Sequence, residues 1–455
     1  MSDRLRLGIA PAYLLLCLVL GGSAQGIWAN VLLQLAAVAI IAWAYLGRRA
    51  ERQPLAERRL GVLIGAMLAL VAIQLVPLPP ALWTALPGRE LISDGFALLG
   101  LPPSWQPVSL APYDSVATAL TLLPPLAILA AMIWVKPAPS RWIAMTVIGA
   151  TLAAVFLGAL QVGSPDPATS PWYFYRVSNF GVATGYFANS NHMATLLLMT
   201  IPFVIALASA VAQRTEEVRK RTAAMAIGGG GLVVVLVGLA INGSLAGFGL
   251  APIVTIAGVL LILRPRSGWV RTAAIGAGAL SLVLFVALVA TPLGDRFASA
   301  GVAASISTRQ DMRERTVAAI GTFGIAGSGL GTFRPVYTQF EDPVAVETTY
   351  VNHAHNDYLE LALETGIAGI LLILLFLAWW VAAARKLLKS PAYDHFASAG
   401  MVASAAVLIH SVVDFPLRTA SISGLFAMCL ALMLVSRHNA SSSDDLRPTR
   451  HVVID

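Results

Sequence analysis

The polar residues best suited to chemistry lie in one short segment, VNHAHNDYLELALETGIAG, at residues 351–369. If a helix begins near Asn356, the asparagine caps its first turn and Asp357 lies at the positive end of the helix dipole. His355 then stands just ahead of the helix, where that positive end disfavours imidazolium and favours a neutral imidazole. A neutral imidazole can act as a general base, so His355 is the candidate catalytic residue.

Three carboxylates follow on one side of this expected helix. Asp357, Glu360 and Glu364 recur at spacings of three and four residues, which places them on one helix face. The chain then continues as nearly pure hydrocarbon, and a charged face cannot point into lipid. We therefore expect this face to meet the interior of a helix bundle or an aqueous cavity.

The His-Ala-His sequence allows other interpretations. His353 and His355 could bind a metal ion with Asp357 as third ligand, or the segment could be only a capped loop-to-helix junction. The one further acidic pair expected on the same side is Glu341-Asp342, so we expect a site without a metal. His353 could also point elsewhere and only form a hydrogen bond. Beside the base, we group four residues as substrate-binding: His353, Asn356, Asp357 and Glu360.

Arginines and side-chain amides elsewhere complete the candidate site. Arg309 and Arg313 lie one helical turn apart, so both guanidinium groups could bind one anion; the alternative is a solvated surface helix. Arg176 precedes the sequence GYFANSNHMA, in which Asn189 and Asn191 lie where an apolar segment begins. These asparagines could cap that helix or bind substrate, and both alternatives stay open.

The elements that must position these residues are membrane helices. Hydrophobic residues make up 57% of the 455 residues and charged residues 12%, a composition that predicts an all-α polytopic membrane protein. A helix needs ~20 apolar residues to cross a bilayer, and about twelve segments qualify, the first of which we expect to be a retained helix. The segments are 8–25, 28–46, 60–77, 116–135, 142–162, 192–212, 224–241, 249–263, 272–291, 366–384, 396–414 and 420–436.

The distribution of basic residues predicts the orientation. With twelve segments, most of the 30 lysines and arginines fall in loops on one side, which is the positive-inside pattern. The net charge of +7 therefore indicates topology rather than nucleic-acid binding. Both termini are expected in the cytoplasm. The predicted organisation is nine helices in 1–291 with outer loops 78–115 and 163–191, a large periplasmic catalytic loop 292–365 between helices 9 and 10, three helices in 366–436, and a cytoplasmic tail 437–455.

The motif around His355 resembles the signature of the O-antigen ligase and O-antigen polymerase superfamily. His355-Asn356 is followed after nine residues by Gly366-x-x-Gly369, and similar supporting pieces occur in the expected order at 185–194, at Arg309 with 327–333, and at 410–417. Many members carry an arginine, thought to help bind the lipid diphosphate, where this chain has Leu245. That departure places more weight on the other outer arginines and leaves the substrate subclass open.

The resemblance implies a GT-C-like membrane glycosyltransferase in the bacterial inner membrane, metal-independent and inverting, with its active site facing the periplasm. The implied donor is a glycan on undecaprenyl diphosphate, and the acceptor is a sugar hydroxyl of lipid A-core or of a growing O-antigen or exopolysaccharide chain. Alternatives are a protein O-oligosaccharyltransferase and, from another class, a flippase or transporter of the lipid-linked glycan. Transporters carry coupling charges near the bilayer midplane, whereas the predicted segments have ionisable groups at their outer ends.

Overall fold

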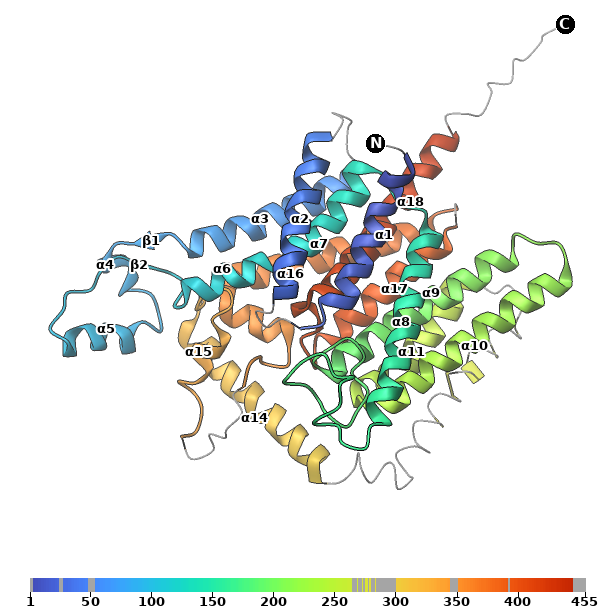
Figure 1. Cartoon of the computed structure of the whole chain (residues 1–455). Helices are drawn as coiled ribbons and strands as arrows, with labels where there is room; N and C mark the ends of the chain where they lie inside the picture. The colour runs from blue at the N-terminus through green and yellow to red at the C-terminus, as the bar shows by residue number, and fades with distance from the viewer. Residues whose placement is uncertain are drawn as a thin grey trace, which may run out of the picture.

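The described part of the chain is almost entirely helical (Figure 1). The computed structural model describes residues 3–23, 28–47, 54–263, 300–343, 351–391 and 393–444, with isolated positions between 268 and 283. Two strands of two residues each, β1 (Pro77–Leu78) and β2 (Gln106–Pro107), pair antiparallel. The helices before residue 140 are α1 (Asp3–Leu20), α2 (Trp28–Gly47), α3 (Leu55–Gln74), α4 (Pro80–Trp83), α5 (Glu90–Leu98), α6 (Pro112–Leu120), α7 (Leu123–Ala130) and the π-helical turn η1 (Ala131–Val135).

The later helices include those that carry the candidate site. They are α8 (Ser140–Val162), α9 (Ser190–Ala212), α10 (Val218–Asn242), α11 (Leu245–Gly258), the π-helical turn η2 (Val259–Leu263), α14 (Ala300–Phe323), α15 (Phe333–Tyr337), α16 (Asp357–Lys389), α17 (His395–His410), the 3-10 turn η3 (Pro416–Arg418) and α18 (Ala420–Asp444).

The helical architecture is that of an all-α polytopic membrane protein. Within the described residues, seven helical segments are long and apolar enough to cross a membrane, and α17 and the apolar part of α18 are shorter. Helices α1 and α3 account for most of the predicted segments 8–25 and 60–77, but each of these helices carries three charged residues in its first turns. The predicted segment 272–291 lies outside the described residues, so the total of twelve spans stays a prediction.

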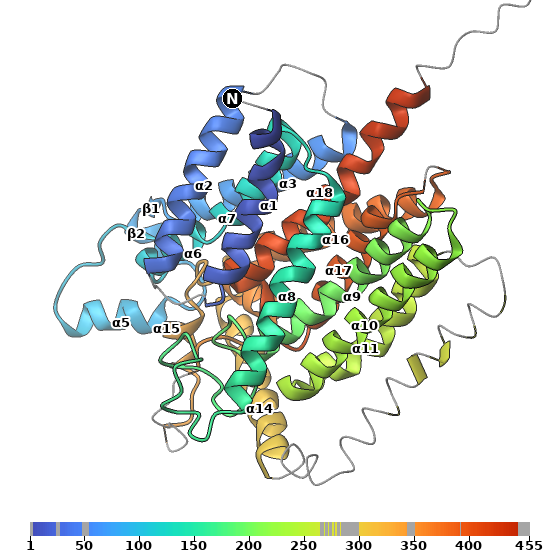
Figure 2. The same ribbon diagram turned by 45° about the vertical axis from the view of Figure 1, so that its right-hand side comes forward.

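Helix α9 is the most enclosed of the candidate spans in the described part of the chain, with 72% of its apolar window buried. It packs against α8, α10, α11 and α17, and α17 packs in turn against α18. Figure 2 shows α1 beside α8. Helix α16 packs against α3 and α14. The start of α16, which carries the candidate residues, therefore lies between these helices and α17 and α18, which α16 also contacts.

The start of α16 agrees with the expectation from sequence. The side-chain oxygen of Asn356 accepts hydrogen bonds from the backbone N–H groups of Tyr358 and Leu359, both at 3.0 Å. This arrangement satisfies two of the donors that every helix leaves free at its N-terminus. The Asn356 amide also donates to the Val412 carbonyl at 2.7 Å, which ties the helix start to the turn after α17.

Helix α16 is broken by a kink at Gly366, whose φ of 61° and ψ of −153° are not helical. The break frees backbone groups that the loop 325–329 satisfies. The N–H groups of Ser328 and Gly329 donate to the carbonyls of Leu363 and Glu364 at 3.0 and 2.8 Å, and the Ile367 N–H donates to the Ile325 carbonyl at 3.1 Å. The predicted boundary between catalytic loop and membrane helix, at residues 365 and 366, thus coincides with this kink, at which two helices meet within α16.

Two side chains from the N-terminal part of the chain stabilise this kink. The Gln74 amide, at the end of α3, donates to the Glu364 carbonyl at 2.9 Å and accepts from the Leu330 N–H at 3.1 Å. The guanidinium of Arg89 is fully buried and donates to the carbonyl of Gly327 at 3.2 Å. Three segments far apart in the sequence therefore hold the first turns of α16 in place.

We expect Gly366→Ala to destabilise the protein. A Cβ at this position would lie 2.1 Å from the Ile325 carbonyl oxygen, and the positive φ is strained for any L side chain; backbone strain of this kind costs about 1–3 kcal/mol. The measurement is the Tm of the detergent-solubilised protein. Gly229→Ala, inside α10 with no neighbour within 4 Å, is the matched control and should leave Tm equal or higher, because alanine favours helix. Equal Tm values for both variants would contradict the role of the kink.

Candidate active site

His355 lies in the turn before α16 and has an unusual backbone conformation. Its φ of 49° is the only positive value at a non-glycine residue in the described part of the chain, and side chains rarely adopt this region. Its Nδ1 lies 3.1 Å from the His353 carbonyl oxygen. Because a carbonyl can only accept, Nδ1 carries the hydrogen and the neutral ring has its lone pair on Nε2. The ring therefore offers one basic nitrogen.

The imidazole of His355 is neutral at neutral pH. Burial lowers its pKa to about 4, the positive charge of Arg309 contributes in the same direction, and the His353 carbonyl and Glu360 oppose the shift. We predicted a neutral His355 from its position at the helix dipole. The neutral form is confirmed, but burial and Arg309 are the main causes.

The carboxylate face of α16 surrounds one arginine, Arg418. Its guanidinium nitrogens lie 3.6 Å from Asp357, 3.3 Å from Glu360 and 3.1 Å from Glu364. The three acidic side chains are at most 3% exposed. This confirms that the face is turned into the bundle. Charges removed from water are stable only when they are paired and hydrogen-bonded, and Arg418 supplies that partner.

His353 is held by one of these carboxylates. Its Nδ1 lies 2.7 Å from Oε1 of Glu360, and the Ala354 N–H donates to Oε2 at 2.8 Å. An ionised carboxylate only accepts, so Nδ1 of His353 is the donor. Asp357, the third ligand that a metal site would need, is directed to Arg418 and accepts from the Ser411 hydroxyl at 2.8 Å. The two histidines and Asp357 are therefore not arranged around one point.

The turn at residues 411–418 forms the other wall of the site. The Asp357 N–H lies 3.0 Å from the Ser411 carbonyl oxygen and 3.3 Å from that of Asp414. Asp414 itself is fully buried, and its pKa is raised to about 6 because burial outweighs the attraction of Arg309 and the interactions with Asn191 and the Phe415 backbone. The same turn carries Arg418. It therefore contacts the acidic face at Asp357, through backbone hydrogen bonds, and at Glu364, through the Arg418 guanidinium.

Among the three predicted anion-binding arginines, the structure brings Arg309 to the site. Its charge acts on the pKa values of both His355 and Asp414. Arg313 and Arg176 are exposed, and neither forms a hydrogen bond or ion pair with a described residue. The expectation that Arg309 and Arg313 point together at one anion stays a prediction.

The asparagines before α9 are used within the fold. Asn189 caps this helix by accepting from the Asn191 N–H at 2.8 Å, so the capping alternative is confirmed for Asn189. The Asn191 side chain accepts from the Ser244 hydroxyl at 2.7 Å, and Ser244 caps α11. Leu245, which follows it, is exposed. A substrate contact by either asparagine stays a prediction.

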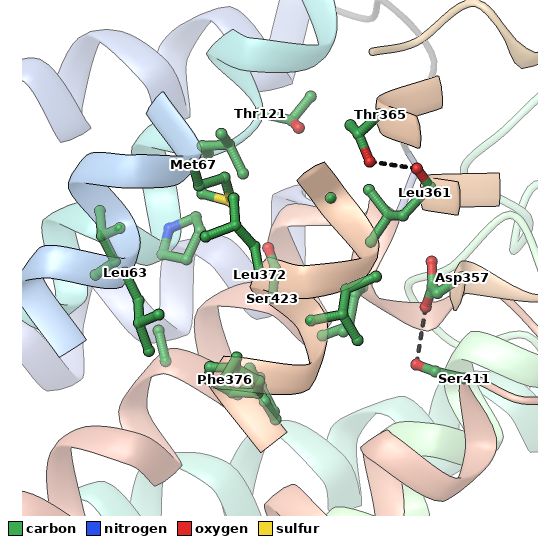
Figure 3. A pocket seen from close by; sticks show the side chains of 18 of the residues that line it. Leu63, Met67, Thr121, Asp357, Leu361, Thr365, Leu372, Phe376, Ser411 and Ser423 are labelled. Atoms are coloured by element: carbon green, nitrogen blue, oxygen red, sulfur yellow. Dashed lines mark hydrogen bonds between the residues drawn. The ribbon is translucent and has the colours of Figure 1, made fainter. Parts of the chain in front are cut away.

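An apolar cavity of about 340 Å³ adjoins the acidic face. Its walls come from α3, α6, α7, α16 and α18, and its polar lining includes Asp357, Ser411 and Arg418. Figure 3 shows Leu63, Met67, Leu372 and Phe376 on one side of the cavity, and the hydrogen bond from Ser411 to Asp357 at its other end. The cavity thus has an apolar body and a charged end.

Sequence reasoning missed two residues of this site. Arg418 was one of several outer arginines, and nothing local in the sequence pairs it with α16; the signal that could have found it is the need of three carboxylates on one buried face for a cation. Phe415, whose ring contacts three imidazoles, lies in the stretch 410–417 that carries part of the resemblance, but it was given no role because an apolar residue beside a helix end is ordinary.

Comparison with known families supports the resemblance found in the sequence. Residues 230–374 match the family described as O-antigen ligase. The matched range includes Arg309, the glycines at 327–331 and the segment from His353 to Gly369. No curated protein matches the chain.

We expect Arg418→Met to be strongly destabilising. It would leave three carboxylates without their cation, and breaking a buried ion pair by removing one partner costs about 3–5 kcal/mol. Arg418→Lys, which keeps the charge, should be milder. The measurement is Tm in detergent, with Arg219→Met on the exposed start of α10 as control.

The double variant Arg418→Met/Glu364→Met tests the cause. Removing one carboxylate together with the arginine reduces the uncompensated charge, so this protein should be more stable than Arg418→Met alone. Equal or lower stability of the double variant would show that the arginine acts by some route other than charge pairing.

Proposed function

We propose that this chain, whose residues 230–374 match the O-antigen ligase family, transfers a glycan en bloc from undecaprenyl diphosphate to a sugar hydroxyl. In this proposal the site faces the periplasm of a bacterial inner membrane, and the acceptor is lipid A-core or a growing polysaccharide. The observation that carries the proposal is His355, whose basic Nε2 is kept neutral beside the charge of Arg309.

The reaction balances with these two residues. The acceptor hydroxyl gives its proton to Nε2 of His355 while its oxygen forms a bond to the anomeric carbon of the donor. The bond from that carbon to the diphosphate oxygen breaks, and its electron pair stays on the lipid diphosphate. Attack from the face opposite the leaving group inverts the anomeric centre. The imidazolium then gives its proton to water, which is favourable because the site lowers its pKa.

Arg309 links donor binding to the strength of the base. Its guanidinium can hold diphosphate oxygens through two parallel hydrogen bonds, so the leaving group needs neither a proton nor a metal ion. A bound diphosphate also neutralises the positive charge that helps to lower the pKa of His355. The pKa then rises towards the working pH, where a general base is most effective. Arg313 and Arg176 are proposed as further contacts of the same diphosphate.

The cavity beside the acidic face supports a lipid-linked donor. An isoprenoid chain is apolar along its length, as is the body of this cavity. The diphosphate is proposed to lie at Arg309 rather than at Arg418, which is already paired with three carboxylates. Asn356, Asp357 and Glu360 are proposed to position the site from the start of α16. The identity of the acceptor decides between ligase, polymerase and protein glycosyltransferase, and it is read from the product of the assay below.

We expect His355→Ala to lower kcat by ~10²–10⁴-fold, which is the range of general base catalysis, and to leave Tm and donor binding near wild type. The measurement is glycan transfer by the purified protein from lipid-linked donor to lipid A-core, oligosaccharide or peptide acceptors. His353→Ala should be milder, since His353 is directed to Glu360. EDTA should have no effect.

Other outcomes of this assay would revise the proposal. If His353→Ala lost more activity than His355→Ala, the base would be His353. Loss of activity in EDTA that a divalent ion restores would favour a metal site. Transbilayer movement of the donor without any transfer product would favour a flippase.

Arg309 should be the arginine to which the reaction is most sensitive. Arg309→Gln removes both the diphosphate contact and a charge that lowers the pKa of His355, so kcat should fall by about 10²-fold or more and the acidic limb of the pH profile should move up from about pH 4. Arg309→Lys keeps the charge but loses the planar fork and should be intermediate. Arg313→Lys and Arg176→Lys should have smaller effects. Full activity of Arg309→Lys would exclude bidentate binding at this position.

A further inference from the structure

Phe415 is surrounded by histidine rings. It lies between α17 and α18 and is 4% exposed. Its ring centroid lies 4.3 Å from that of His353, with the planes tilted by 33°, and 5.0 Å from that of His355, with the planes at 89°. His192 of α9 makes a third contact at 5.0 Å and 90°. Edge-to-face pairs at such distances are favourable arrangements of aromatic rings.

The backbone around Phe415 is fixed to the start of α16. On its N-terminal side, the carbonyls of Ser411 and Asp414 accept from the Asp357 N–H, and the Val412 carbonyl accepts from the Asn356 amide. On its C-terminal side, Pro416 begins η3, which ends at Arg418 among the three carboxylates. The backbone of Phe415 therefore cannot move relative to α16 without breaking these contacts.

His355 needs such a support. Its positive φ is a conformation that persists only where the surroundings enforce it. The hydrogen bond from Nδ1 to the His353 carbonyl fixes one point of the ring and leaves rotation about that bond. The edge-to-face contact with Phe415 removes this rotation, and the ring of Phe415 also excludes water from that side of the imidazole.

We propose that Phe415 is a positioning residue, which orients His355 Nε2 towards the acceptor hydroxyl and keeps water from the imidazole. This inference rests on the proposed function for the identity of the base. Phe415 does not touch the reacting atoms; it acts through His355.

The charged and titratable groups that face His355 stay in place when Phe415 is replaced. They are Arg309 of α14, His353 in the same turn, Glu360 of α16 and His192 of α9. Losing the aromatic ring admits water, and burial is the largest cause of the low pKa of His355. The pKa should therefore rise from about 4 towards the ordinary value of a histidine.

The experiment compares Phe415→Leu and Phe415→Tyr in the full-length protein. Misplacement of a catalytic group by about 1 Å can cost 10²-fold, so Phe415→Leu should lower kcat by roughly 10–100-fold and leave the donor KM nearly unchanged. Phe415→Tyr should recover most of the loss. The matched control is Phe340→Leu, a partly buried phenylalanine that packs against Phe323, and it should retain wild-type kcat.

A second readout does not depend on activity. The rate at which diethyl pyrocarbonate modifies His355, followed by peptide mass spectrometry across pH, reports the fraction of neutral imidazole. The midpoint should rise in Phe415→Leu and in Phe415→Met, which fills the space without an aromatic face, but not in Phe340→Leu. If Phe415→Leu lowers Tm, Phe415→Met supplies the same comparison.

The outcomes separate the two proposals. An unchanged kcat in Phe415→Leu and an unchanged midpoint in Phe415→Leu and Phe415→Met, with His355→Ala inactive, would overturn the positioning role and keep the base. Near-normal activity of His355→Ala would remove the base, while a raised midpoint in the Phe415 variants would still show that Phe415 controls the environment of His355.

Discussion

The guanidinium of Arg418 lies among the carboxylates of Asp357, Glu360 and Glu364, where water is largely excluded. Any of these charges alone would be costly to bury, so they can be buried only together. The first two turns of α16 and the turn at 411–418 must therefore form as one unit. This pairing fixes where the surrounding residues lie.

The residues of the proposed reaction are attached to this unit. Glu360 holds His353, Asn356 caps α16 and binds the same turn, and Phe415 lies in the turn against both His353 and His355. The kink at Gly366 ends the polar part of α16, and the loop 325–329 satisfies the backbone groups that it frees. The glycines at 327 and 366 are needed there because their backbones meet too closely for a Cβ. The glycine-rich run thus packs against α16 and supports the site.

The apolar cavity and the charged unit share Asp357 and Arg418. This places an apolar region directly beside the buried ionic cluster of α16. In a site with little water, the attraction between Arg309 and an anion is stronger than in bulk solvent, and so is its effect on the pKa of His355. The charge of Arg309 and the burial of His355 therefore act together on the pKa of the proposed base.

The sequence by itself determined the features that depend on composition or on near neighbours. The apolar content requires membrane helices, Asn356 caps α16 because capping is a local interaction, and the spacing of Asp357, Glu360 and Glu364 places them on one face. Only the tertiary structure determined which distant residues contact this segment. Arg418 is 54 residues from Glu364, Gln74 is 290 residues from it, and the contacts of Phe415 join three segments. Such contacts depend on how the helices pack, and local pattern carries no information on packing. For the same reason, the sequence predicted a neutral His355 but named the helix dipole as its cause, whereas the burial and the Arg309 charge that lower its pKa exist only in the folded protein.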